Sequence, residues 1–210
     1  MTDRRSASIS SRKQPRQARS TELVAAVLEA AAHVLMTEGA QRFTTARVAE
    51  RAGVSVGSLY QYFPNKAAIL YRLQSDEWRR TTDLLRAILE DVERPPLTRL
   101  RNVVHAFLHS ECEEAGIRVA LDDAAPLYRD APEAREANEA GLRIVHNFLR
   151  EALPGTTDEV RVAAGELIAA TLSQVGKRFS EAPRTSQEIE AYANAMADMF
   201  CAYVSAVGRA

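Results

Sequence analysis

Residues 43–70 read FTTARVAERAGVSVGSLYQYFPNKAAIL, and this stretch holds the strongest local signals in the 210-residue chain. Thr44 is a typical N-cap for a short helix, and Gly53 can take the left-handed backbone conformation of the tight turn that follows it. Ser55 can cap a second short helix, which Pro64 then stops. The stretch therefore predicts two short helices joined by a turn, which is the helix-turn-helix pattern.

The two faces of these short helices differ in chemistry. The inner face is apolar, with Val48 and Leu59 placed to pack against Phe43 and Phe63. The outer face of the second helix, which we expect to run to about Tyr62, carries mainly small and polar residues: Ser55, Val56, Gly57, Ser58, Gln61 and Tyr62. Serine hydroxyls reach phosphates or base edges, valine suits a thymine methyl group, and glycine permits close approach, so this face is suited to DNA.

The end of the second helix and the beginning of the next helix offer further groups for DNA. Tyr60 and Tyr62 offer hydroxyl groups on rigid rings, and Lys66 begins the next helix, where its charge and the free N–H groups favour a phosphate. A structural alternative stays open, because the same geometry occurs in proteins that bind no DNA.

Composition and charge agree with a helical protein of two modules. The chain has 36 alanines against 9 glycines and 8 prolines, with 6% aromatic residues, which favours helices over sandwiches and barrels. Residues 1–80 carry 13 Lys/Arg and 7 Asp/Glu, a balance of +6, whereas residues 81–210 carry 14 and 21, a balance of −7. A basic N-terminal part on an acidic remainder is consistent with a polyanionic partner.

The chain divides into three predicted regions. Residues 1–19 hold six Lys/Arg and four Ser and are expected to form a flexible basic arm. Residues 20–70 form the predicted DNA-binding domain, which opens with a helix at 21–38, and residues 71–210 form a larger helical domain. The helices expected beyond the helix-turn-helix are 66–92, 97–115, 117–125, 132–152, 157–181 and 185–207, separated by Pro and Gly.

The run RVAERAGVSVGSLYQYFPNKAAIL closely resembles the DNA-binding domain of the TetR family of bacterial transcriptional regulators, and HVLMTEGAQRFTT before it fits the end of that family's first helix. The resemblance covers about residues 20–70. It implies that Thr45 contacts a phosphate, that Ser55–Ser58 lie in the major groove of a double-stranded DNA operator, and that Tyr60, Tyr62 and Lys66 hold the DNA backbone. The second helix has no Arg or Lys, which gives more weight to phosphate contacts, Gln61, the basic arm and DNA shape.

The last two helices carry apolar stripes that suit pairing with a second copy. The residues expected at a dimer interface are Leu172, Val175, Phe179, Met196, Phe200 and Tyr203. The resemblance implies a homodimer in which these helices pair with their symmetry mates in a four-helix bundle. The alternative is that the stripes pack inside one chain.

The resemblance also implies a small-molecule cavity among the helices from about residue 66 to 152. His109, Tyr128, His146 and Asn147 are the candidate polar groups of such a pocket. His105, His109 and Glu113 follow one another at four-residue steps, but two histidines without a defined third partner are more often packing or surface groups, so no metal and no cofactor are expected.

These residues predict an all-α, ligand-responsive repressor that releases a palindromic operator when a small molecule binds. No catalytic motif or phosphate-binding glycine loop is present, so an enzyme is not expected. An architectural DNA-binding protein without a ligand, an activator and a co-repressed regulator remain open. No secretory signal or membrane span is expected, and two distant cysteines, Cys112 and Cys201, fit the cytoplasm.

Overall fold

The structure is a computed structural model that describes the backbone of residues 18–128 and 132–209, and the side chains of residues 20–128 and 141–209. Within this part of the chain every regular element is a helix, so the all-α prediction is confirmed. The chain forms two compact units: one contains the residues up to Trp78 together with Gly116–Arg135, and the other contains Arg79–Ala115 together with Glu136–Ala210.

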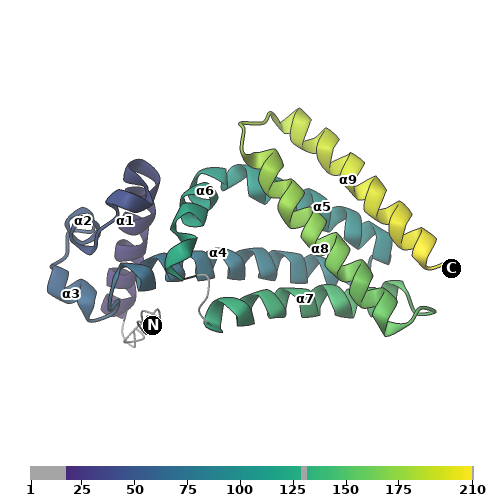
Figure 1. Ribbon diagram of the computed structural model, residues 1–210, viewed down its shortest axis with the longest axis horizontal. Helices are drawn as coiled ribbons and strands as arrows, with labels where there is room; N and C mark the ends of the chain where they lie inside the picture. Colours follow the sequence, from purple (N-terminus) through teal and green to yellow (C-terminus); the bar gives the residue numbers. More distant parts are fainter. Residues whose placement is uncertain (1–17, 129–131, 210) are drawn as a thin grey trace, which may run out of the picture. The chain divides into compact units, whose positions relative to one another are not determined.

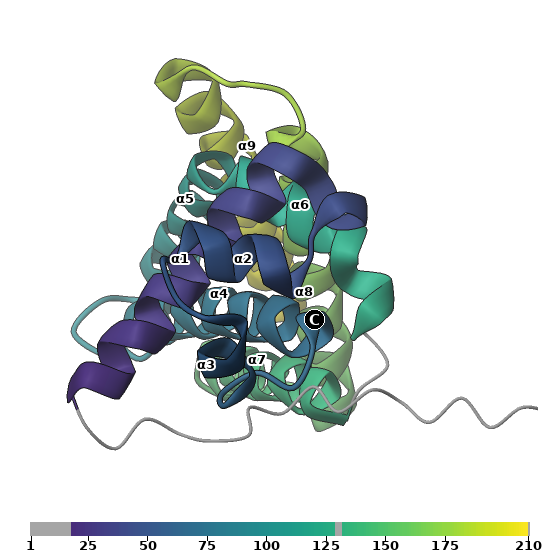
Figure 2. The same ribbon diagram turned by 90° about the vertical axis from the view of Figure 1, so that its left-hand side faces the viewer.

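The first unit holds the predicted helix-turn-helix. Its helices are α1 (Ala18–Arg42), α2 (Thr45–Arg51), α3 (Val56–Tyr60), the beginning of α4 (Lys66–Leu89), α6 (Ala115–Ala124) and the short 3-10 turn η1 (Ala125–Leu127) (Figures 1 and 2). Phe43, Val48, Leu59 and Phe63 are all at most 1% exposed, so the inner face predicted from the sequence is the core of this unit.

Caps and turns define the short helices. The Thr44 hydroxyl accepts a hydrogen bond from the Arg47 N–H, and the Ser55 hydroxyl accepts one from the Ser58 N–H. Gly53 has a φ of 67°, the left-handed conformation expected of it between the two helices. The second short helix ends at Tyr60, two residues earlier than predicted, because Gln61 and Tyr62 already form tight turns to Ser58 and Leu59.

The second unit is built around α5 (Pro96–Glu113). This helix packs against both α8 (Asp158–Ser180) and α9 (Ser186–Val207), with α7 (Pro132–Ala152) and the end of α4 completing the core (Figure 1). α8 approaches α5 closely at Gly176, where an added Cβ would lie only 2.9 Å from Cε1 of Phe107. A side chain at this position would therefore force the ring to move.

The boundary between the units differs from the predicted domain boundary at residue 70. It falls within α4, between Trp78 and Arg79, and the first unit also includes α6. The reason is apolar packing, since Leu121, Ala124 and Tyr128 are buried in the same core as α1 and α2. Most of the arm predicted at residues 1–19 lies outside the described residues, and residues 18 and 19 begin α1.

The first helix is long and apolar enough to cross a membrane by length and composition alone, over Ser20–Arg42. Its apolar residues have another role in this structure. Val27, Ala31 and Leu35 are completely buried against the rest of the helix-turn-helix unit. These side chains belong to a protein core, which accounts for the apolar composition of α1.

Candidate nucleic-acid interface and ligand cavity

α3 presents a face with little side-chain bulk to solvent. Val56 is 40% exposed, Ser55 and Gly57 are exposed, and Ser58 is half-buried. A Cβ built at Gly57 would meet only the Ser55 hydroxyl, at 3.8 Å, so the backbone of α3 is open to a neighbour here. The hydroxyls of Ser55 and Ser58 lie 2.8 Å apart, and either can donate to the other or to a ligand.

Thr45 and Tyr60 link the beginning of α2 to the end of α3. Their hydroxyl oxygens lie 3.1 Å apart, and Tyr60 is 39% exposed. Two groups expected at DNA phosphates are thus held next to each other on the surface. Gln61, the C-cap residue of α3, is exposed as well.

The next helix supplies the positive end of this surface. The Asn65 side chain accepts a hydrogen bond from the Ala68 N–H at 2.9 Å and caps α4, whose first residue is Lys66. Lys66 is half-buried and begins α4, whose first-turn N–H groups have no acceptor within the helix. Tyr62 differs from the prediction in its surroundings: it is 8% exposed and packs in the core, so its hydroxyl is the only group it could offer to DNA.

An apolar cavity of about 190 Å³ lies in the second unit. Its wall is formed by residues of α4, α5, α7 and α8, among them Leu85, Phe107, Val145 and Ile168. Among the described residues that line it, Ser173 alone has a polar side chain and none is charged. The cavity is therefore suited to an apolar group, because a polar one would lose its hydrogen bonds to water.

A buried arginine ties together three helices at this cavity. Arg99, only 1% exposed, donates a hydrogen bond of 2.6 Å to the Leu89 carbonyl oxygen at the end of α4 and pairs with Glu151 on α7. Its guanidinium also lies 5.5 Å from the ring centre of Phe148. Because Leu89 and Phe148 both line the cavity, Arg99 holds part of its wall in place.

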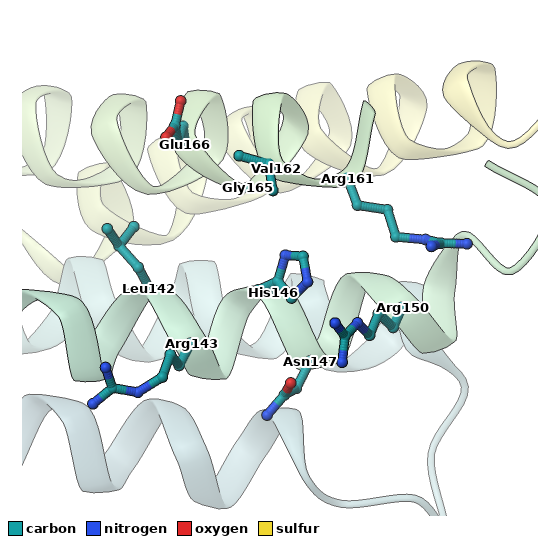
Figure 3. A pocket seen from close by; sticks show the side chains of 9 residues that line it. All are labelled: Leu142, Arg143, His146, Asn147, Arg150, Arg161, Val162, Gly165 and Glu166. Carbon is teal, nitrogen blue, oxygen red and sulfur yellow. The ribbon is translucent and has the colours of Figure 1, made fainter. Parts of the chain in front are cut away.

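A more polar groove of about 380 Å³ lies between α7 and α8. Arg143, His146, Asn147 and Arg150 line it from α7, and Arg161 and Glu166 are its charged residues from α8 (Figure 3). Sequence reasoning found His146 and Asn147 but missed the arginines. For Arg143 and Arg150 the available signal was their spacing from Asn147, because positions 143, 147 and 150 follow the three- and four-residue steps of one helix face.

The four residues predicted to line a ligand pocket are not all brought together. His146 and Asn147 line the groove. His109 lies on α5, where its Nε2 atom is 3.6 Å from Glu190 on α9, and the Nδ1 atom of His105 is 3.4 Å from the same carboxylate. Tyr128 is buried in the core of the first unit, with its hydroxyl 2.9 Å from the Leu121 carbonyl oxygen. The described residues contain no group of three or more side chains placed to hold a metal ion.

The residues predicted at the dimer interface also separate into two groups. Leu172, Met196 and Phe200 are at most 6% exposed and pack in the core of their own chain, as the alternative of packing within one chain expects. Val175, Phe179 and Tyr203 are half-buried at the edge of that core. Other apolar residues of the same helices are exposed, among them Val160, Ala163, Leu167 and Ala170 on α8, and Ala191, Ala195, Met199 and Ala202 on α9.

The two free cysteines are poor candidates for nucleophiles. Burial raises the pKa of the Cys112 thiol, and burial likewise raises the pKa of the Cys201 thiol. Both are therefore mainly protonated near neutral pH, whereas the thiolate is the reactive form.

Comparisons with known proteins agree with this arrangement. Residues 27–73 match the family described as bacterial regulatory proteins, tetR family, and residues 95–207 match the tetracyclin repressor-like C-terminal domain. The nucleoid occlusion factor SlmA of Vibrio campbellii is 30% identical over 172 residues, which are 80% of this chain and 87% of that protein.

Solved structures show the same fold at low identity. A putative TetR-family regulator from Mesorhizobium loti has a TM-score of 0.67 at 15% identity, with 89% of this chain and 98% of that chain covered. FadR from Bacillus subtilis, solved in complex with stearoyl-CoA, has a TM-score of 0.67 at 17% identity. The match covers 84% of this chain and 97% of that chain.

The fold and the exposed α3 surface define a helix-turn-helix DNA-binding regulator with a separate C-terminal unit. The matches to both domains cover most of the chain. This protein belongs to the TetR family of bacterial transcriptional regulators.

Proposed function

We propose that the protein is a dimeric repressor that binds a palindromic operator and releases it when a small molecule binds the second unit. The observation that carries this proposal is the pairing of two features in one chain. An exposed, low-bulk α3 face is available to a major groove, and a separate unit holds an apolar cavity next to a polar groove. A protein that only holds DNA needs the first feature but not the second.

The proposal includes a dimer because of how such DNA-binding units work. One helix-turn-helix contacts little DNA, so such units bind in pairs across half-sites about 34–36 Å apart. The exposed apolar residues of α8 and α9 offer a face for the second copy, and their alanines allow close approach of helices. We place the interface on this face, not on the buried residues that the sequence first indicated.

α4 is the element suited to couple ligand and DNA. It begins with Lys66 at the proposed DNA surface in the first unit and ends with Leu85 and Leu89 in the cavity wall of the second. A ligand that binds better to a form with a different spacing of the two α3 helices lowers DNA affinity by that difference in binding free energy.

Selection of bound sequences from random double-stranded DNA tests the proposal, followed by binding measurements on the selected site at two salt concentrations. We expect one palindromic site, bound by two chains, with an affinity that falls steeply as salt rises. The proposal fails if no sequence is enriched, or if compounds that bind the second unit leave the affinity for that site unchanged.

A second candidate function comes from the relatives. SlmA proteins, named nucleoid occlusion factors, reach 30–37% identity, above the 15–20% of the solved regulators. If this chain shares that role, its binding to chromosomal DNA is itself the output and does not need release by a small molecule. Mapping of bound sites over the chromosome separates the two, because a repressor concentrates at promoters.

A further inference from the structure

We propose that the ligand is an anionic amphiphile, with a short alkyl or acyl chain in the apolar cavity and a negatively charged head in the groove between α7 and α8. This inference rests on the proposed function, in which the second unit holds the ligand, and it adds the chemical class. It follows from how the two spaces adjoin, what lines each of them, and how large they are.

The cavity and the groove are neighbours along the same two helices. Leu142 on α7 lines both of them and is 37% exposed, so it lies where the cavity meets the groove. On α8, Gly165 lines the groove, and a Cβ added there would lie 3.2 Å from Leu149 and 3.5 Å from Val145, which both line the cavity. The two spaces therefore adjoin along α7 and α8, with Leu142 at their shared edge.

The cavity is suited to the chain of such a ligand. Its lining offers one hydroxyl, Ser173, and no charge, so a charged or strongly polar group inside it would lose hydration without compensation. Its volume of about 190 Å³ equals about six water molecules at ~30 Å³ each. Small-molecule sites usually measure about 300–1,000 Å³, so this cavity alone holds only part of a ligand.

The groove is suited to the head. Three guanidinium groups line it, from Arg143, Arg150 and Arg161, against one carboxylate, Glu166. Figure 3 shows Glu166 at one end of the groove and Arg150 and Arg161 at the other, so the carboxylate that lines the groove lies away from these two arginines and their end is the more cationic one. A guanidinium binds a carboxylate or a phosphate with two parallel hydrogen bonds.

Arg150 and Arg161, at the cationic end, differ in how many of their N–H groups remain available to a ligand. Arg161 already donates to the Leu153 and Pro154 carbonyl oxygens and to the Asp158 carboxylate, which offsets its charge, so it has few donors and little net charge left for a ligand. Arg150 is exposed and has no ion pair among the described residues. His146, which extends from α7 towards α8, lies in the groove as well (Figure 3). Arg150 is therefore the residue that we assign to the anionic head.

Calorimetric titration of the full-length protein with four compounds tests this assignment. Nonanoate and octyl phosphate carry the same octyl chain with a carboxylate or a phosphate, 1-octanol carries the chain without charge, and inorganic phosphate carries the charge without a chain. We expect an anionic octyl compound to bind at least tenfold more tightly than 1-octanol, and inorganic phosphate to bind weakly. The better of the two anionic compounds identifies the head group.

Variants at each end locate the parts of the ligand. Arg150→Gln is expected to lower the affinity for the anionic compounds at least fivefold and to leave 1-octanol unchanged. Arg178→Gln, which removes an exposed charge from α8 outside the groove, is the matched control and is expected to change neither. Ala169→Leu places a larger side chain in the cavity wall and is expected to weaken all three octyl compounds. If this variant is unstable, the comparison of Arg150→Gln with Arg178→Gln still decides the position of the head.

The proposal is overturned if 1-octanol binds as tightly as the charged compounds, if none of the octyl compounds binds, or if Arg150→Gln and Arg178→Gln have equal effects. Operator affinity, measured in parallel, separates this inference from the proposed function. An anionic compound whose binding depends on Arg150 but which does not release the operator supports the site and contradicts the release mechanism. An operator released by a compound of another class supports the mechanism and contradicts the proposed ligand class.

Discussion

The guanidinium of Arg118 on α6 lies 2.9 Å from the carboxylate of Glu77 on α4, and Glu77 is only 3% exposed. Gln74 donates a second hydrogen bond to the same carboxylate, and the Tyr128 hydroxyl lies 3.2 Å from the Gln74 side-chain oxygen. A buried polar network thus joins α6 to the first half of α4. Because α4 begins at the proposed DNA surface, this network holds in place the helix that carries Lys66.

Removal of one partner of this ion pair should destabilise the protein strongly. Arg118→Met leaves the Glu77 carboxylate buried without its cation, and we expect the free energy of unfolding to fall by roughly 3 kcal/mol. The double variant Glu77→Gln/Arg118→Met should recover most of that loss, because no uncompensated charge remains. Urea unfolding at one fixed protein concentration measures both changes. Equal losses in the single and double variants would contradict the electrostatic explanation.

Substitution by alanine should have opposite effects on stability at two helical glycines, Gly176 at the contact between α5 and α8 and Gly141 in α7. Gly176→Ala adds a Cβ at 2.9 Å from Phe107, and we expect this overpacking to lower the free energy of unfolding by about 1–3 kcal/mol. Gly141→Ala, within α7, meets no atom within 4 Å and should stabilise the helix by about 0.5–1 kcal/mol. Thermal unfolding of the two variants checks the opposite signs. Stabilisation by both would show that Phe107 moves aside at little cost.

Local signals predicted much of the fold because they depend on neighbours in the sequence. Thr44, Ser55 and Gly53 fixed the helix-turn-helix, and they have in the structure the conformations expected of them. Contacts between distant segments were harder to predict. The stripe that includes Leu172 could face the chain's own core or a second copy, since either partner buries apolar area equally well. Tyr128 was predicted for a ligand pocket, whereas the packing of α6 with the first unit placed it in another core.

The difference between the buried and the exposed residues of α8 leads to a prediction for the dimer. Leu167 is 52% exposed on the outer face of α8, so Leu167→Glu should place like charges across the proposed two-fold interface and separate the chains. Sedimentation should then show a single 23.2 kDa chain with unchanged helicity. Val119→Glu, at a position 49% exposed on α6, is the matched control and should remain a dimer.

Leu172→Ala should act differently, although the sequence placed it in the same interface. Leu172 is 5% exposed in the core of its own chain, so the substitution leaves a cavity that costs about 2–5 kcal/mol of stability. The dimer is expected to persist wherever the chain is folded. Separation into folded monomers by Leu172→Ala would instead place this residue at the interface.

The beginning of α9 predicts a dependence of stability on pH. Glu188 and Thr185 form a capping box, and the hydrogen bonds from the Thr185 N–H and hydroxyl lower the pKa of the Glu188 carboxyl from its ordinary 4.5. A lowered pKa in the folded state contributes stability that is present above about pH 4.5 and is lost as the pH falls through the folded value. Glu188→Ala should therefore be less stable than the unaltered protein at pH 7, and the difference in urea midpoint should shrink at lower pH. A difference that stays constant with pH would contradict this origin.

Lys66 provides the sharpest prediction for DNA binding, because we propose that its charge and the first turn of α4 contact a phosphate of the operator. Lys66→Gln should weaken binding to all sequences by a similar factor, since phosphate contacts carry no sequence information. Each lost contact lowers the slope of log affinity against log salt by about 0.9, so a dimer should lose about two. Lys177→Gln, an exposed lysine on α8 in the other unit, is the matched control and should leave the slope unchanged. Fluorescence anisotropy at several salt concentrations, on the selected operator and on a scrambled duplex, separates the outcomes. A loss confined to the operator would mean that Lys66 takes part in reading bases. An unchanged slope would mean that other residues of the α3 surface make the contact with the DNA backbone.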